Sequence, residues 1–370
     1  MIHEKLLCAA VLMAGCVAGC GSSAKPSTGA TSTGGATGSA GSASSAGGAG
    51  LPAAGGSGNG GSSGGMSNAV QLVSHPGCGS IDLVVASGTL YWTEQAKGTV
   101  NSIAVTGGTP TVIATGQSMP GPLAVDATAV YWGNAGDKTV MKQPLPTGAA
   151  SIFVPANGDV VNALLVDSGV LYIGRGYSAQ KIPTSGGTPT TLMTSPMSDL
   201  GMPGAFALDA THLYQTELSH NAISRETLDG MQDGLTSDGV TRVMLAPDRL
   251  AVSVGELVTD AIALQNGNVI WADGSKIEYK GVNLGEHDSL AIMANDAGFN
   301  AISGFVVSGN KVYLGESSDN NIQSVPLMFG GTAADATVIA SGQTNPAQFA
   351  ADATNIYWRT DDCTIMKLPQ

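Results

Sequence analysis

The chain has 370 residues, and its 15 Lys or Arg against 28 Asp or Glu give a net charge of −13. An acidic chain without clustered cations argues against nucleic acid as a partner, because a phosphate backbone is bound by such clusters. Residues 21–67 consist almost entirely of Gly, Ser, Ala and Thr. That composition cannot form a core, so the folded part is expected at 68–370.

The N-terminus has the organisation of an export signal. Leu6 to Gly19 is a run of 14 uncharged residues, which is too short to span a bilayer but is typical of a secretory signal. Its end, VAGC at 17–20, resembles the signal of bacterial lipoproteins, where the protease cuts before the cysteine and the cysteine is acylated.

That resemblance implies a signal peptide at 1–19, lipid attachment at Cys20 and a Gly/Ser/Ala-rich, disordered tether at 20–67. The chain would then be exported and would contact membrane lipid through acylated Cys20. Gly21 differs from the Asp that commonly retains lipoproteins at an inner membrane, which favours the outer membrane. The alternatives are a second cleavage site at Cys16 and a plain signal peptide with an incidental cysteine.

A nine-residue phrase, with Tyr at its eighth position in six of its copies, recurs seven times at spacings of 40 to 56 residues. A period just above 40 residues is that of a four-stranded propeller blade. Each phrase predicts a hairpin, because two apolar strands flank a short turn. The phrases are VVASGTLYW (84–92), AVDATAVYW (124–132), LVDSGVLYI (165–173), ALDATHLYQ (207–215), ALQNGNVIW (263–271), VVSGNKVYL (306–314) and AADATNIYW (350–358).

Four of the predicted turns begin with an aspartate, namely Asp126, Asp167, Asp209 and Asp352. A carboxylate at this position accepts hydrogen bonds from backbone N–H groups two residues on, so the sequence predicts local turn caps. A ring of metal ligands is the alternative. Ala86 occupies the same position in the first unit, and a shared ion would not tolerate it.

The seventh unit ends after its third strand, whereas residues 68–77 resemble the fourth strand and connection at 110–121. We therefore predict that the segment after the tether completes the last blade, because an open ring would expose sheet edges. The predicted fold is an all-β, seven-bladed β-propeller. Closure would place Cys78 beside Cys363, and an exported compartment permits a disulfide between them. The alternative is two unpaired thiols.

The repeats, with YWTE at 91–94 as the nearest match to the namesake tetrapeptide, resemble those of YWTD/NHL-type (TolB-like) β-propellers. Lipobox, Gly/Ser tether and repeats together resemble bacterial propeller lipoproteins. The chain departs from the first family in two ways. YWTD domains usually have six blades, and the Asp of the tetrapeptide is replaced by Glu94, Asn134 or Thr360. The resemblance therefore implies the fold and hardly any specific function.

The sequence contains no recognisable catalytic or metal-binding motif, so no catalytic residue and no cofactor are expected. The usual ligand face of a propeller is formed by the loops between second and third strands and between blades. Acidic side chains there would suit Ca²⁺, which takes oxygen ligands; the alternative is a solvated acidic rim. The candidate residues are Glu94, Asp137, Arg175, Glu217, His220, Asp273, Glu316, Arg359 and Asp361.

Two functions follow from these patterns. Anchor, tether and repeats without catalytic groups favour a membrane-anchored binding or scaffold module for a protein or an envelope glycan. The alternative is a propeller enzyme, either a metal-dependent lactonase-like hydrolase or a streptogramin-lyase-like lyase. Carboxylates and a histidine converging at one channel mouth would favour the enzyme.

Overall fold

The structure is a computed structural model, and the chain divides into two units, Met1–Ser63 and Gly64–Gln370. All residues described below belong to the second unit. Within them, no helix is long and apolar enough to cross a membrane. The described ranges are 68–74, 80–194, 202–217, 222–229, 248–251, 261–272, 276–282, 291–294, 301–329 and 336–370.

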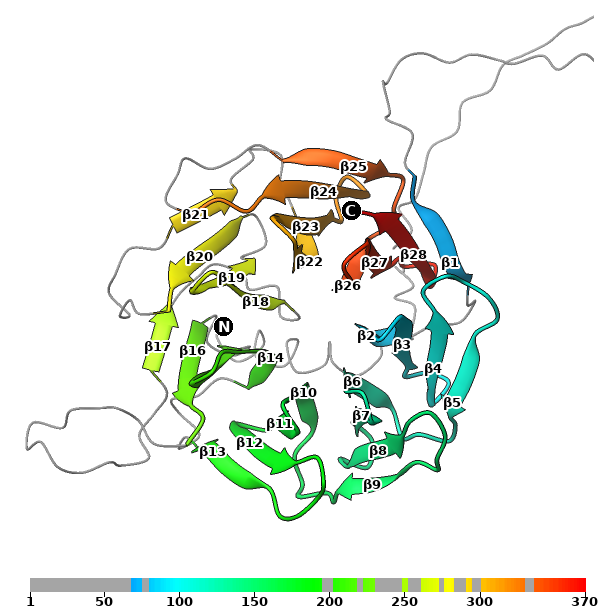
Figure 1. Ribbon diagram of the computed structural model, residues 1–370, viewed down its shortest axis with the longest axis vertical. Coiled ribbons are helices and arrows are strands. Elements are labelled where there is room, and N and C mark those ends of the chain that lie inside the picture. The colour runs from blue at the N-terminus through cyan, green and yellow to red at the C-terminus, as the bar shows by residue number, and fades with distance from the viewer. Residues whose placement is uncertain are drawn as a thin grey trace, which may run out of the picture. The chain divides into compact units, whose positions relative to one another are not determined.

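The described residues form seven antiparallel sheets of four strands each, and each sheet is one blade (Figure 1). The first strands of blades one to seven lie nearest the axis: β2 (Ser80–Ala86), β6 (Pro120–Val125), β10 (Val161–Asp167), β14 (Pro203–Leu208), β18 (Ile262–Gln265), β22 (Ile302–Ser308) and β26 (Ala347–Ala351). The second strands are β3 (Thr89–Glu94), β7 (Ala129–Asn134), β11 (Val170–Arg175), β15 (His212–Glu217), β19 (Asn268–Ala272), β23 (Lys311–Glu316) and β27 (Asn355–Arg359).

The third strands are β4 (Thr99–Ala104), β8 (Val140–Pro144), β12 (Ser178–Pro183), β16 (Ala222–Thr227), β20 (Ile277–Gly281), β24 (Asn321–Pro326) and β28 (Thr364–Pro369). The outermost strands of blades one to six are β5 (Thr111–Ala114), β9 (Ser151–Val154), β13 (Thr190–Thr194), β17 (Asp248–Ala251), β21 (Ala291–Ala294) and β25 (Thr337–Ser341). The first strands of successive blades contact one another all the way round, and β2 also contacts β26. The all-β, seven-bladed propeller predicted from the repeats is confirmed.

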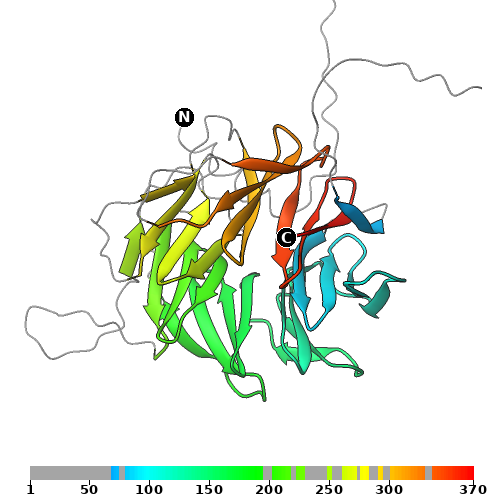
Figure 2. The same ribbon diagram turned by 45° about the horizontal axis from the view of Figure 1, so that its top comes forward.

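The ring closes through the N-terminal strand. β1 (Val70–Ser74) pairs antiparallel with β28, with Val70 opposite Lys367 and Ser74 opposite Thr364. Blade seven therefore combines β26, β27 and β28 with β1, which lies beside β28 in Figures 1 and 2. Val73 is buried there against a cluster that includes Tyr357 and Ile365. The predicted closure of the last blade is confirmed.

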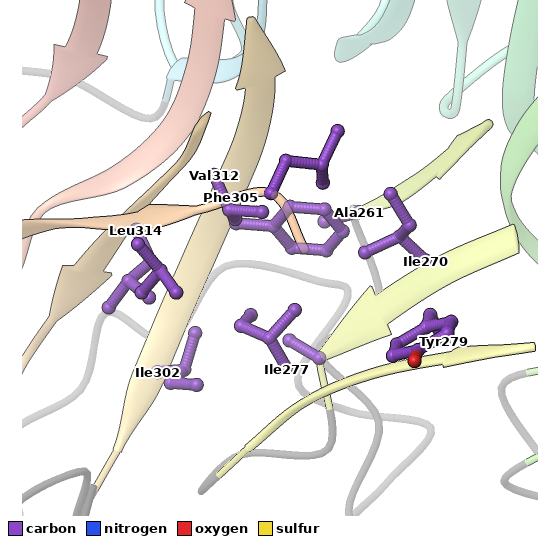
Figure 3. Close-up of a cluster of buried hydrophobic side chains, with 11 residues drawn as sticks. Ala261, Ile270, Ile277, Tyr279, Ile302, Phe305, Val312 and Leu314 are labelled. Carbon is purple, nitrogen blue, oxygen red and sulfur yellow. The ribbon is translucent and has the colours of Figure 1, made fainter. Parts of the chain in front are cut away.

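The hydrophobic core lies between neighbouring blades rather than in one central layer. Side chains alternate along a strand, so each blade has two faces to bury. Between blades five and six, Ile270 and Ile277 pack with Phe305 and Leu314 (Figure 3). Every blade therefore needs both neighbours, which is why a closed ring of repeats is stable where a single repeat would not be.

The predicted turn caps are confirmed at three of the four aspartates. Asp352 Oδ1 accepts from the backbone N–H groups of Thr354 (2.7 Å) and Asn355 (2.9 Å) and from the Thr354 hydroxyl (2.8 Å). Asp126 and Asp209 are bonded in the same way. These carboxylates hold the hairpin between first and second strands, at the opposite end of the blade from the expected ligand face.

Candidate functional site

Several of the predicted ligand-face residues share one structural position, the last residue of a second strand. We call the end of the ring where second strands end and first strands begin the upper face. Glu94 lies opposite Ser80, and Glu316 lies opposite Ile302, at the first residue of the neighbouring inner strand. Arg175 and Glu217 end their second strands in the same manner. His220 and Asp273 lie outside the described residues.

The strand-end glutamates Glu94, Glu217 and Glu316 are buried. Glu94 accepts from the indole N–H of Trp92 (3.2 Å) and pairs with Lys97 (2.9 Å). Glu316 accepts from the backbone N–H groups of Ala301 (2.9 Å) and Ser318 (3.2 Å). These two carboxylates tie upper-face loops to the strand below them, so a solvated acidic rim does not describe them.

Arg175 ties blade three to blade two. Its side chain is 1% exposed, and its guanidinium donates to the carbonyl oxygens of Pro155 (3.3 Å) and Lys138 (3.2 Å). Burial lowers the pKa of Arg175, and the nearby carboxylate of Asp159 opposes that shift. The buried guanidinium therefore holds the backbone of two segments of blade two, at Lys138 and at Pro155.

The remaining candidates lie nearer the surface. Asp137 is exposed and accepts from the backbone N–H (3.2 Å) and hydroxyl (2.7 Å) of Thr139. Asp361 is exposed as well, and both of its oxygens accept from Asn345 Nδ2 at 2.9 and 3.0 Å. Arg359 donates from Nε to Gln348 Oε1 (2.7 Å). No ligand tests these residues, so their role in recognition stays a prediction.

The upper face also carries exposed apolar side chains that the sequence analysis did not single out. Met119, Val160 and Tyr177 are 38–40% exposed. The Met119 carbonyl accepts from the N–H of Ala135, and the Val160 carbonyl accepts from the N–H of Gly176. Met119 and Val160 each immediately precede a first strand. The sequence could have placed Met119 and Val160 next to predicted first strands. It could not have shown that their side chains are exposed, because exposure depends on how the blades pack.

The described part of the chain contains no cluster of potential metal ligands. No three or more His, Cys, Asp or Glu side chains gather there as they would around a metal ion. His212 is the first residue of β15, at the opposite end of the blade from the upper face, with Nδ1 2.8 Å from the Thr211 hydroxyl. The Ca²⁺ expectation stays a prediction.

The cysteines are described in part. Cys363 precedes β28, has a positive φ of 71° and is disulfide-bonded. Cys78 and Cys20 lie outside the described residues, so the Cys78–Cys363 pairing and the lipid attachment stay predictions.

No protein-family model matches the chain, and no curated protein matches it. Solved β-propellers do. A streptogramin B lyase structure superposes with a TM-score of 0.62 at 13% identity, over 81% of this chain and 96% of that one. A catalytically inactive virginiamycin B lyase from Staphylococcus aureus with quinupristin gives 0.61 at 14% identity, over 82% and 99% of the two chains.

The WD40 β-propeller domain of Doa1 gives a TM-score of 0.58 at 12% identity, over 82% of this chain and 98% of that one. An enzyme and a WD40 domain therefore superpose on this chain about equally well. Sequence identities this low carry the architecture and not the activity. What the likeness shows is that the chain has the fold of a seven-bladed β-propeller.

Proposed function

We propose that the protein is a binding or scaffold lipoprotein. It displays a seven-bladed propeller on a cell-envelope membrane, through acylated Cys20 and the tether at 20–67, and engages a protein or glycan of that envelope. The anchor is supported by VAGC at 17–20, and the tether by its Gly/Ser/Ala composition. The propeller itself is the kind of rigid scaffold on which recognition loops are carried.

The observation that carries the proposal is the bracing of the upper-face loops by buried charged side chains. Arg175 holds the carbonyls of Lys138 and Pro155, and Glu316 holds the backbone of Ala301 and Ser318. A loop that is already fixed loses little entropy when a partner docks. Such loops form a pre-organised recognition surface.

The test is capture from detergent-solubilised envelope with the full chain, beside a control carrying only residues 1–67. Both proteins should appear in the membrane fraction, since both keep the signal and Cys20. Only the full chain should retain an envelope component above background, and that component should rebind when purified. Retention equal to the control contradicts the binding role, and recovery of both proteins in the soluble fraction contradicts the anchor.

The alternative, a lactonase-like or lyase-like enzyme, stays a prediction from the sequence. The streptogramin B lyase likeness supports its fold alone. No observation on the described residues favours that chemistry over binding.

A further inference from the structure

The exposed apolar residues of the upper face belong to one continuous group of loops in blades two and three. The Met119 carbonyl accepts from the backbone N–H of Ala135, the first residue of the β7–β8 loop. That loop continues to Lys138, whose carbonyl accepts from Arg175 and whose Nζ donates to the Gly158 carbonyl. We call Met119, Val160 and Tyr177, with the loops that join them, the loop surface.

The loop surface has a fixed shape. Gly176 donates to the Val160 carbonyl, which sets Tyr177 beside the connection into blade three. Met119 adopts a φ of 56°, a left-handed conformation that costs free energy in a residue other than glycine. Such a conformation persists where surrounding contacts impose it, which here include the bond from Ala135 to the Met119 carbonyl.

The fully exposed charges of the loop surface are two carboxylates. Asp137 and Asp159 are both exposed. A Cβ added at Gly176 would lie 2.8 Å from the carboxyl carbon of Asp159, so this carboxylate lies against the residue next to Tyr177. Of the two cations nearby, Arg175 is buried, and Lys138 is half-buried with its Nζ bonded to the Gly158 carbonyl, so the two fully exposed charges are the carboxylates.

We propose that the loop surface binds an apolar, basic peptide segment of a partner protein, a proposal that rests on the binding function above. Met and Tyr are side chains that protein interfaces favour. A Lys or Arg of the segment would pair with Asp137 or Asp159, and an Arg would also stack on Tyr177. The net charge of −13 attracts such a segment from a distance.

A glycan is the competing occupant, and the composition of the loop surface argues against it. Sugar rings stack on aromatic side chains, and Tyr177 is the one exposed aromatic residue in the described ranges. Met119 and Val160 offer a sugar neither a hydrogen bond nor a stacking platform, whereas they suit an aliphatic side chain of a peptide.

The experiment selects peptides from a random 12-residue display library on the full wild-type chain. Bound peptides are counter-selected on a loop-surface variant, Met119→Ser with Val160→Ser and Tyr177→Ser. The matched control is a rim variant, Val112→Ser with Ile152→Ser and Val338→Ser. These residues are also exposed and apolar but lie on the outermost strands β5, β9 and β25. Equal melting temperatures for wild type and both variants show that folding is unaffected.

We expect enriched peptides that combine apolar residues with an excess of Lys or Arg. Their affinity should fall about tenfold or more on the loop-surface variant and stay within about twofold on the rim variant. Asp137→Asn with Asp159→Asn should weaken binding and flatten its decline between low and high salt.

Three outcomes overturn the proposal. The first is enriched peptides without an excess of basic residues, and the second is equal binding to the loop-surface variant. The third is retention of insoluble cell-wall glycan by the wild type and not by the loop-surface variant. Each would leave the envelope capture of the full chain intact, so the failure of this proposal is distinguishable from failure of the binding function.

Discussion

Blades two, four and seven share a bonded pair of side chains, an aspartate and the tyrosine five residues later. In blade seven the Tyr357 hydroxyl donates to Asp352 Oδ2 at 2.7 Å, and in blade four Tyr214 donates to Asp209 at the same distance. The carboxylate thus receives donors from the turn and from the strand that follows it. One aspartate fixes both the turn and the placement of the buried tyrosine.

The bond shifts the pKa values of both partners. Burial alone would raise the pKa of Asp352, but the hydrogen bonds from Tyr357, Thr354 and Asn355 outweigh it and lower that pKa from 3.8 to about 2. Burial, and then the bond to Asp352, raise the pKa of Tyr357. The stabilisation from Asp352 is therefore present above pH 4 and is lost as the pH falls through about 2.

Replacing Tyr357 with Phe should lower the free energy of unfolding by about 1–2 kcal/mol at pH 7, because the carboxylate loses one charge-assisted donor. The difference from wild type should shrink as the pH falls from 4 towards 2. It should also shrink above pH 10, where the unfolded tyrosine ionises first. Urea unfolding of both proteins at several pH values measures the decrease below pH 4 and the decrease above pH 10.

Tyr91→Phe is the matched control, because Tyr91 occupies the same strand position in a blade whose turn has Ala86 in place of the aspartate. Its cost should be smaller and should not change across the acid range. An equal, pH-independent cost for both variants would show that the Asp352–Tyr357 bond adds nothing to stability.

At the scale of the strands, cations on the third strand of one blade reach a carbonyl of the next. Lys142, opposite Tyr131, donates to the Thr184 carbonyl at 2.6 Å. Lys181 and Arg225 donate in the same way to Leu228 and Val282 of their next blades. Lys367 of blade seven donates to the Val105 carbonyl of blade one at 2.7 Å. The last bond crosses the point where the ring closes.

Lys367→Met should lower the free energy of unfolding by about 1–3 kcal/mol, since it keeps the aliphatic stem and removes a charged donor from the Val105 carbonyl. Lys311→Met is the control, because Lys311 is exposed and lies 5.9 Å from the ring centroid of Tyr313 in its own blade. Its change should stay within about 0.5 kcal/mol. If the two variants unfold at the same denaturant concentration, the bond from Lys367 to the Val105 carbonyl does not contribute measurably to stability.

Close approach between blades also limits which residues the second strand accepts. A Cβ at Gly315 would lie 2.6 Å from the Pro346 carbonyl oxygen of the next blade. Thr93, at the equivalent position, fits because its hydroxyl donates to the Gly121 carbonyl at 2.9 Å. Small residues at this position therefore reflect packing between neighbouring blades.

For the whole molecule, the sequence predicted what depends on local periodicity. The strand count, the turn caps and the pairing of the segment after the tether with the last unit all follow from repeats visible in the chain. The Asp–Tyr bond was missed, although the spacing from Asp352 to Tyr357 is visible, because the hairpin register decides whether the two side chains meet. The burial of Glu94, Arg175 and Glu316 was missed because the burial of a strand-end side chain depends on how the blades pack, which the local pattern of residues does not show.

The closure of the ring can be tested within β1, because one of its valines is buried and another is exposed. Val73 is 4% exposed and Val70 is 56% exposed. Val73→Asp should lower the free energy of unfolding by about 3 kcal/mol or more, because it places a charge in the buried cluster that contains Tyr357 and Ile365. Val70→Asp should change it by about 0.5 kcal/mol or less. Trp92 and Trp358, both buried in the two blades that meet at the closure, report the transition by fluorescence. Equal effects of the two substitutions would mean that β1 does not hold blade seven in solution.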